Sequence, residues 1–257
     1  MPRKTAEDII RKEVETVRAR RIILDQLEGG LKTGAELREK IATDIKAQMM
    51  MKGSSKRDIK KVKVTSPKLY YNTKRLEDLG IIVSWKQSQY RLFELEPKAI
   101  HPVRRALEIS KPLLYVTSLS RPEDQRPFVQ WLTNNPHFKP RKLLIFVEAA
   151  HWTRGVARLA DRFIPDDSFR VWTTEWREVP DDVTSTDDEK EYGNLQGAAD
   201  FLEAAIIDNI FIHDMVIDLT LGPTLISLAL AKLSAEYSIT AFHVARYDAS
   251  NSEISYY

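Results

Sequence analysis

Residues 66–82 read SPKLYYNTKRLEDLGII, and the fold of the N-terminal part of the chain follows from them. Serine before proline is a strong helix start, because serine caps helices and proline suits the first helical position. Leu69 and Leu76 then lie on one face of the helix, and Gly80 supplies its stop. Two β-rich runs around a turn-like Lys-Gln-Ser follow at 81–95. The sequence therefore predicts a helix followed by a β-hairpin.

Two more helices are expected before this segment. Apolar residues recur at helical spacing over 10–27, after a cap at Thr5, and Gly29 ends that helix. A shorter helix fits residues 33–45. The basic residues 46–63 are expected to form a loop or a frayed helical extension. Three helices followed by a hairpin is the order of a winged helix-turn-helix.

The segment KRLEDLGII and the hairpin that ends in YRLFEL resemble the recognition helix and wing of ArsR-like regulators. The resemblance covers about residues 20–96 and implies DNA binding. One departure is that residues 46–63 are longer than the usual turn between the second and third helices. This insertion could grip phosphates, or it could change how the module docks.

The residues expected to contact DNA are basic, hydroxyl-bearing or amide side chains in and around the helix that begins at Ser66. Asn72 could pair bidentately with adenine in the major groove, while Tyr and Ser donate to phosphates. Lys and Arg add affinity that falls steeply with salt. The alternative is that the module mediates only protein contacts or dimerisation. The predicted set is Lys56, Arg57, Lys60, Lys61, Lys63, Ser66, Lys68, Tyr71, Asn72, Lys74, Arg75 and Lys86.

Charge divides the chain in two. Residues 1–110 hold 25 Lys and Arg against 15 Asp and Glu, a balance of +10. Residues 111–257 hold 14 against 22, a balance of −8, and the two add to the net charge of +2. A basic domain attracts a polyphosphate, whereas an acidic domain is poorly suited to lie along one. Two domains with different partners are expected.

The second half of the chain alternates apolar β-rich runs with helical ones. Near-continuous apolar strands imply a parallel sheet that is covered on both faces. The chain is therefore expected to be an α/β protein with a winged helix-turn-helix at 1–96, a linker at 97–110 and a Rossmann-like, doubly wound, mainly parallel domain at 111–257. The expected strands are 112–118, 142–148, 169–175, 215–219 and 238–246, with the tail 252–257 pairing at a sheet edge; the expected helices are 123–133, 152–163, 196–208 and 223–235.

Two loops of this domain combine hydroxyls, a glycine and helix starts. Sheets of this kind bind ligands where strand order reverses, so the loops meet if the first strand lies beside the fourth. Free N–H groups at the helix starts suit a phosphate or a nucleotide. The alternative is that the loops only end their strands. The predicted ligand-binding residues are Ser118, Leu119, Ser120, Arg121, Asp218, Thr220, Gly222, Pro223 and Thr224.

The segments MVIDLTLGPTLISLALA and LLYVTSLSRPEDQRPFVQWL resemble the late and first strand-loop-helix motifs of CARF domains, the CRISPR-associated Rossmann-like sensors of cyclic oligoadenylates. The resemblance covers about residues 111–246. It implies a nucleotide second messenger as ligand, such as a cyclic oligoadenylate, and a homodimer. Two departures are a single glycine in the late loop and Leu225 where Lys or Arg is frequent, so the ligand could differ.

Several function classes receive no support. The chain has no cysteine, and Glu148 with His151 lacks a third metal ligand, so no metal site is predicted. No glycine-rich dinucleotide fingerprint follows a predicted strand, and no cofactor is required. The Arg-x4-6-His motif of CARF ribonucleases is absent, and no catalytic residue is assigned. No signal-like start or membrane-length apolar run is present, so a cytoplasmic protein is expected.

The expected function is a ligand-responsive, DNA-binding transcriptional regulator of CRISPR or other antiviral defence genes. Two alternatives stay open. One is a CARF-type ring nuclease or nucleotide hydrolase with an accessory winged helix. The other is an interaction module that recruits a defence complex.

Overall fold

The computed structural model describes residues 5–120, 122–135, 138–149, 172–184, 194–245 and 254–257. It divides after Ser110 into two compact units, the N-terminal unit and the C-terminal unit, which are described separately.

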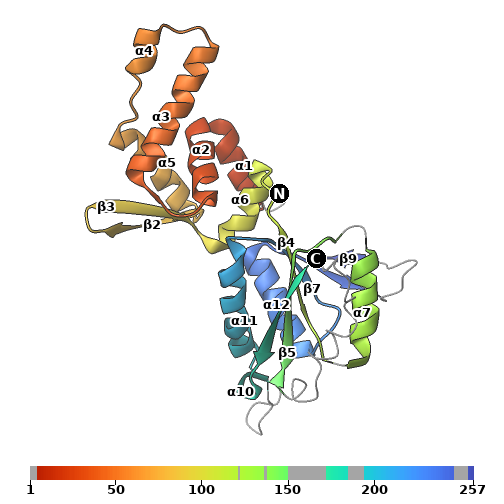
Figure 1. The fold of residues 1–257 in the computed structure, drawn as a ribbon. Coiled ribbons are helices and arrows are strands. Elements are labelled where there is room, and N and C mark those ends of the chain that lie inside the picture. The colour runs from red at the N-terminus through yellow and green to blue at the C-terminus, as the bar shows by residue number, and fades with distance from the viewer. Residues whose placement is uncertain (1–4, 121, 136–137, 150–171, 185–193, 246–253) are drawn as a thin grey trace. The chain divides into compact units, whose positions relative to one another are not determined.

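The N-terminal unit combines helices with a small antiparallel sheet (Figure 1). The sheet has the order β1-β3-β2, so β3 lies in the middle. The helices are α1 (Ala6–Thr16), α2 (Arg18–Glu28), α3 (Gly34–Met51), α4 (Lys56–Lys60), α5 (Ser66–Asp78), η1 (Pro97–Ala99) and α6 (Ile100–Leu107), and the strands are β1 (Lys32–Thr33), β2 (Ile82–Gln87) and β3 (Tyr90–Leu95). The helix predicted to begin at Ser66-Pro67 and the hairpin after it are confirmed, but Ser66 is not the cap: Thr65 is at the N-cap and makes no side-chain cap hydrogen bond.

The first predicted helix is wrong in one respect, because it is two helices. Val17 between them is extended, with φ −133° and ψ 101°. The break lets α1 pack against α6 while α2 contacts α3, α5 and α6. Thr5 caps α1 as expected, in a reciprocal capping box with Asp8.

The segment 97–110, predicted as a linker with a short helix at 103–109, is grouped with the N-terminal unit, and its helix begins and ends earlier than predicted. Residues 97–107 form η1 and α6, and Ile100 and Val103 of α6 are fully buried. The buried Arg104 guanidinium contacts the Glu28 carboxylate of α2, with Nε 3.0 Å from Oε1. The helix therefore belongs to the core of the N-terminal unit, where its burial and a buried ion pair hold it.

The C-terminal unit is built on a six-stranded sheet in the order β6-β5-β4-β7-β8-β9. All neighbours are parallel except β8 and β9, which are antiparallel. The strands are β4 (Leu113–Ser118), β5 (Lys142–Glu148), β6 (Thr173–Val179), β7 (Asp214–Asp218), β8 (Thr240–Val244) and β9 (Ile254–Tyr256). The pairing of the tail is confirmed, whereas the third strand begins four residues later than predicted because it is a half-exposed edge strand with a weak apolar signal.

Helices cover both faces of this sheet (Figure 1). Tyr115 and Leu143 pack with Phe128 and Trp131 of α7. Side chains alternate along a strand, so the buried Leu114, next to Tyr115, points to the other face of the sheet, on which α11 and α12 lie. The described helices are α7 (Pro122–Asn134), α10 (Asp181–Thr184), α11 (Leu195–Ile210) and α12 (Thr224–Tyr237).

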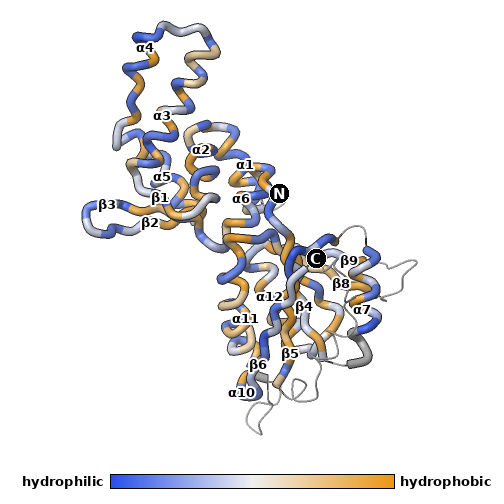
Figure 2. The backbone as a smooth tube through the Cα atoms, viewed as in Figure 1, coloured by the Kyte–Doolittle hydropathy of each residue, from blue (hydrophilic) through white to orange (hydrophobic). Residues whose placement is uncertain are grey.

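Figure 2 shows strongly hydrophobic residues along the central strands, as a sheet covered on both faces requires. The predicted α/β, Rossmann-like, mainly parallel fold is confirmed. The helix predicted at 152–163 lies outside the described residues.

One buried histidine makes the stability of the N-terminal unit depend on pH. Burial, and then the charges of Arg104 and Arg105, lower the pKa of His101 from its usual 6.5 to about 3. Between these values the unfolded chain binds a proton that the folded unit does not, so the free energy of unfolding falls as the pH falls below 6.5. We expect a loss of about 2 kcal/mol between pH 7 and pH 5 from this residue. Denaturant titrations should show it in the wild type and not in His101→Leu; the same loss in the variant would contradict the assignment.

Candidate functional sites

The ligand site predicted in the C-terminal unit lies where strand order reverses. From β4 the chain proceeds to β5 and β6 on one side, while β7 and β8 lie on the other side. β4 and β7 are parallel neighbours, with Leu113 opposite Asp214 and Val116 opposite Ile217. The expectation that the first and fourth predicted strands are neighbours is confirmed. The loops that follow them consequently start at the same edge of the sheet.

The two loops touch each other through Ser118 and Gly222. Ser118 Oγ donates a hydrogen bond to the Leu221 carbonyl at 2.9 Å. Gly222 has φ +97°, and a Cβ built on it would lie 1.9 Å from Ser118 Oγ and 2.7 Å from Ser118 Cβ. Only glycine fits here, because both the backbone angle and the available space exclude a side chain.

Buried polar contacts hold the start of the late loop. The fully buried Asp218 carboxylate accepts hydrogen bonds from the Tyr115 hydroxyl at 2.6 Å and from the Thr220 amide at 2.9 Å. Thr220 Oγ1 in turn accepts from the Val244 amide at 2.8 Å. Asp218 therefore caps the loop, and its buried side chain supports the loop without being exposed.

The predicted ligand-binding residues fall into two groups. Ser118, Leu119 and Asp218 are buried, so their side chains support the loops and do not line a surface. Ser120, Thr220, Gly222 and Pro223 are half-buried and Thr224 is exposed, as a surface that meets a ligand requires. Arg121 lies outside the described residues.

The start of α12 supplies the donors of this surface. Pro223 precedes the helix and makes no side-chain cap among the described residues. The first intrahelical bond beyond it runs from the Ser227 amide to the Pro223 carbonyl at 3.0 Å. The amides of the first turn are therefore not used by a cap, and the positive end of the helix dipole favours an anion there.

Replacing Gly222 tests the contact between the loops. We expect Gly222→Ala to lower the free energy of unfolding of the C-terminal unit by about 2–4 kcal/mol, because strain and overpacking add. Gly30→Ala is the control, since Gly30 also has positive φ but no described atom lies within 4 Å of its Cβ position. It should cost its own unit about 1 kcal/mol in the same denaturant titration. Equal losses would show that the loops do not touch.

The predicted DNA-contacting residues lie on α4, on α5, between these helices and on β2, and two of those on α5 are engaged within the N-terminal unit. Asn72 is only 4% exposed, and its Nδ2 donates to the Lys68 carbonyl at 2.8 Å. Its Oδ1 is buried without a hydrogen-bond partner among the described residues. The prediction that Asn72 reads adenine is therefore wrong. Leu69, Asn72, Thr73 and Leu76 are the buried face of α5, and their spacing of three, four and seven residues was the signal that could have placed Asn72 there.

Arg75 is half-exposed but is engaged within the N-terminal unit. Its guanidinium contacts Glu13 Oε1 of α1, with Nη2 at 2.9 Å and Nε at 3.2 Å. The buried Arg20 of α2 contacts the other carboxylate oxygen of Glu13. Burial alone would raise the pKa of Glu13, but the Arg75 hydrogen bond and the two positive charges hold that pKa below its usual range. Arg75 thus orients α5 rather than reaching outward.

The other predicted residues are exposed. On α5, Tyr71 is 70% exposed beside Lys68 and Lys74, and the Arg20 guanidinium lies 6.0 Å from the centre of the Tyr71 ring. The remaining exposed members of the predicted set are Lys56, Arg57, Lys60, Lys61, Lys63, Ser66 and Lys86.

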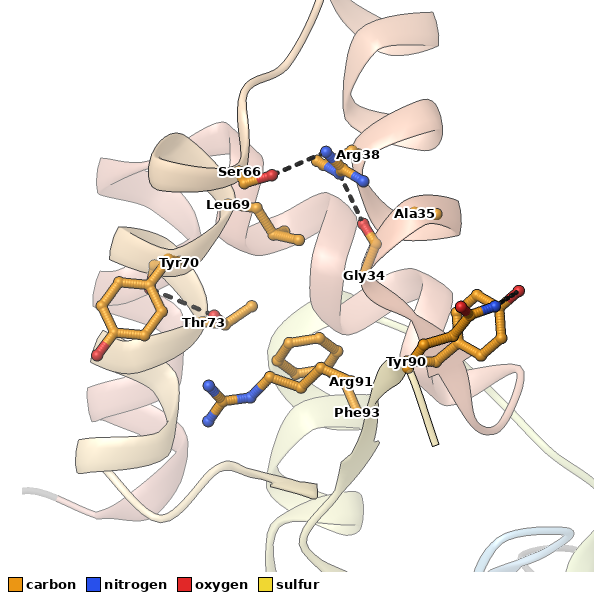
Figure 3. A pocket seen from close by; sticks show the side chains of 11 residues that line it. Gly34, Ala35, Arg38, Ser66, Leu69, Tyr70, Thr73, Tyr90, Arg91 and Phe93 are labelled. Atoms are coloured by element: carbon orange, nitrogen blue, oxygen red, sulfur yellow. Dashed lines mark hydrogen bonds between the residues drawn. The ribbon is translucent and has the colours of Figure 1, made fainter. Parts of the chain in front are cut away.

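A cavity of about 440 Å³ lies between α3, α5 and β3, and no sequence pattern predicted it (Figure 3). Arg38 donates from Nη1 to Ser66 Oγ at 2.9 Å and from Nε to the Gly34 carbonyl at 3.3 Å. On the hairpin side, the Arg91 guanidinium lies 5.8 Å from the centre of the Phe93 ring. The exposed Tyr70 and Tyr90 also line the cavity.

Arg91 is engaged within the unit, since its Nε donates to Ser84 Oγ at 2.9 Å and its Nη2 lies 3.4 Å from Glu77 Oε1. Arg38 pairs with no carboxylate among the described residues, and a guanidinium group beside an aromatic-lined hollow suits a phosphate group. Arg38 and Arg91 come from elements 53 positions apart in the sequence, so only the fold brings them together.

Comparisons with known proteins give little beyond this geometry. No protein-family model and no curated protein matches the chain. Among solved structures, it is similar to Csm6 from Enterococcus italicus bound to cyclic hexa-2'-fluoro-hexa-dAMP, with a TM-score of 0.36 and 8% sequence identity. The match covers 53% of this chain and 34% of that one, so the chain spans about a third of that protein's length.

Two other classes of site are absent from the described residues. These residues hold no group of three or more His, Cys, Asp or Glu side chains that could bind a metal ion. None of the described helices is both long enough and apolar enough to cross a bilayer.

Proposed function

We propose that the chain is a nucleotide-responsive DNA-binding regulator, with a winged helix-turn-helix as N-terminal unit and a CARF-like sensor as C-terminal unit. The observation that carries the proposal is the exposed surface of α5 next to the arginine-lined cavity, on a unit whose charge balance is +10.

The order of elements supports the first part. α2, β1, α3, α5 and the β2–β3 hairpin occur in the order of a winged helix, with α4 inserted between α3 and α5, and β1 pairs with β3 to complete the sheet. In that arrangement α5 is the recognition helix for the major groove. The hairpin is the wing, and it carries the exposed Lys86 at the end nearest its turn.

The structure changes which residues we assign to DNA contact. Lys68, Tyr71 and Lys74 remain, since they project from the exposed side of α5. Asn72 and Arg75 are replaced by residues around the cavity, where Arg38 would contact a backbone phosphate and Tyr70 and Tyr90 would donate hydrogen bonds.

The C-terminal unit supports a second, smaller anionic ligand. Its two touching loops and the uncapped start of α12 lie at the strand-order reversal, where sheets of this class bind nucleotides. The loop motifs resemble those of CARF domains, so the proposed ligand is a cyclic oligoadenylate. Two copies would pair about a two-fold axis, which would present two α5 helices to a palindromic site. The ligand would change DNA affinity only through its different affinity for the two arrangements. By the same resemblance, the regulated genes would be CRISPR or other antiviral defence genes.

Charge-removing substitutions on α5 test DNA binding. We expect the wild type to bind DNA from upstream of its own gene with a steep salt dependence. Lys68→Gln and Lys74→Gln should each lower the slope of log affinity against log salt by about 1. Lys40→Gln is the matched control, because Lys40 is exposed on α3 beside Glu36 and Glu39, away from the cavity. A flat anisotropy titration of the wild type at low salt would contradict the regulator and favour a recruitment module.

Tyr71 and Asn72 are adjacent residues with opposite expected effects. Tyr71→Ala should weaken DNA binding and lower the melting temperature only slightly, since the ring is 70% exposed and its contact with the Arg20 guanidinium is at 6.0 Å. Asn72→Ala should leave base preference unchanged and lower the free energy of unfolding by about 1 kcal/mol, because a buried hydrogen bond is lost. Melting curves together with a base-substitution series would reveal the reverse pattern if Asn72 read a base.

Ligand binding to the C-terminal unit can be tested with cyclic tetra-adenylate. We expect it to raise the melting temperature of this unit in proportion to the logarithm of its concentration, as mass action requires. Thr224→Val should reduce that shift, whereas Thr240→Val should not, because Thr240 is exposed at the start of β8 at the opposite edge of the sheet. Absence of any shift would contradict the proposed ligand, and the appearance of linear products would replace a pure sensor with a ring nuclease.

A further inference from the structure

The second half of α3 and the helix α4 form a projecting arm, residues 45–63. The buried residues of α3 are Leu37, Ile41 and Ala42, and among the described residues none from 43 to 51 is buried. At 1.5 Å per residue, these last nine residues extend about 13 Å. Figure 1 shows the end of α3 and α4 standing clear of the other helices of the N-terminal unit.

The arm is an ordered helical hairpin with a fixed base. Arg18 of α2 contacts the Asp44 carboxylate through Nε at 2.8 Å and Nη2 at 2.7 Å, which anchors α3 where the arm begins. At its far end, Gly53 has φ +73° and donates to the Met50 carbonyl at 3.0 Å. The chain then returns through α4, whose Ile59 is buried.

The charge of the arm indicates which kind of partner could bind it. Residues 45–63 contain seven Lys and Arg against Asp58 alone, a balance of +6. Two such arms would repel each other, which opposes pairing between the arms of two copies. A polyanion would instead release counterions on binding and gain affinity with each phosphate contacted.

Two exposed methionines lie near the tip of this cationic arm. Met50 is 64% exposed and Met51 is 88% exposed, and they directly precede the turn at the tip. Proteins that bend DNA insert apolar side chains, including Met, between base steps from the minor groove, while basic residues hold the adjacent phosphates. Flexible unbranched side chains adapt to such irregular surfaces.

We propose that the arm is a second DNA-binding element, which enters the minor groove beside the base pairs contacted by α5 and kinks the duplex there. Met50 and Met51 insert at a base step, and Lys56, Lys60 and Lys61 contact the phosphates. This inference rests on the proposed DNA-binding function, which α5 could perform without it.

Two A·T duplexes of equal length test the insertion in the full-length protein. Alternating TA steps unstack easily, whereas an A-tract is stiff. We expect the wild type to bind the alternating duplex several-fold more tightly and to bring its fluorophore-labelled ends closer together. Met50→Ala with Met51→Ala should remove both effects and leave the salt slope unchanged. Leu228→Ala, which truncates a 54% exposed side chain on α12, is the control and should change neither.

The phosphate contacts have a separate readout. Replacing Lys56, Lys60 and Lys61 together by Gln should lower the salt slope by about 2–3, following the phosphates no longer neutralised. An unchanged slope in this variant would overturn the proposal.

Three further outcomes would also overturn it, and they are distinguishable. If the wild type binds DNA and the methionine variant still prefers the alternating duplex and shortens its end-to-end distance, the proposed insertion is wrong but the DNA-binding function is not. If that variant instead shifts from dimer to monomer in sedimentation while bending persists, the methionines contact a second copy. If the wild type binds neither duplex at low salt, the proposed DNA-binding function fails together with the arm.

Discussion

The rotation of α5 about its own axis determines what the N-terminal unit can present to a partner. Leu69 and Leu76 lie in the core, and Glu13 of α1 fixes the rotation further by accepting hydrogen bonds from Arg75. Because one face is held in this way, Lys68, Tyr71 and Lys74 are left outward. The Glu13 carboxylate is buried and paired with two arginines, so removing Glu13 would leave the buried Arg20 without its carboxylate partner and release Arg75, which would loosen this helix.

Much of this fold could be read from local chemistry. The Ser66-Pro67 start, the Gly80 stop and the alternation of the hairpin give the elements around α5, and continuous apolar runs give the parallel strands of the C-terminal unit. The wrong predictions concerned contacts between residues far apart in the sequence. Residues 97–110 contain two prolines and looked like a connector, yet α6 is fixed by Glu28, a contact across 76 positions that no local pattern shows. The break at Val17 has the same origin, because α1 turns there to meet α6.

The candidate sites also combine features that depend on local chemistry with features that depend on the complete fold. Residue types at helix starts and loop ends were informative, because the chemistry of an N–H or a hydroxyl does not depend on distant neighbours. Exposure was not predictable in this way. Asn72 was assigned by what an amide can do in a groove, whereas its position on the buried face follows from the helical period. Arg38 and Arg91 carried no signal singly, since a cavity between three elements exists only after folding.

The contact between Ser118 and Gly222 has a consequence for how this protein can change over time. The two positions share a volume that holds only one side chain, so neither loop of the strand-order reversal can be varied alone. A larger residue at 222 would need a glycine at 118 and a different backbone angle as well, which is two coupled steps through an unstable intermediate. Changes to the surface of the proposed site are therefore expected at positions such as 120, which is half-buried, and 224, which is exposed, whereas a side chain at 222 requires changes at 118 and in the backbone.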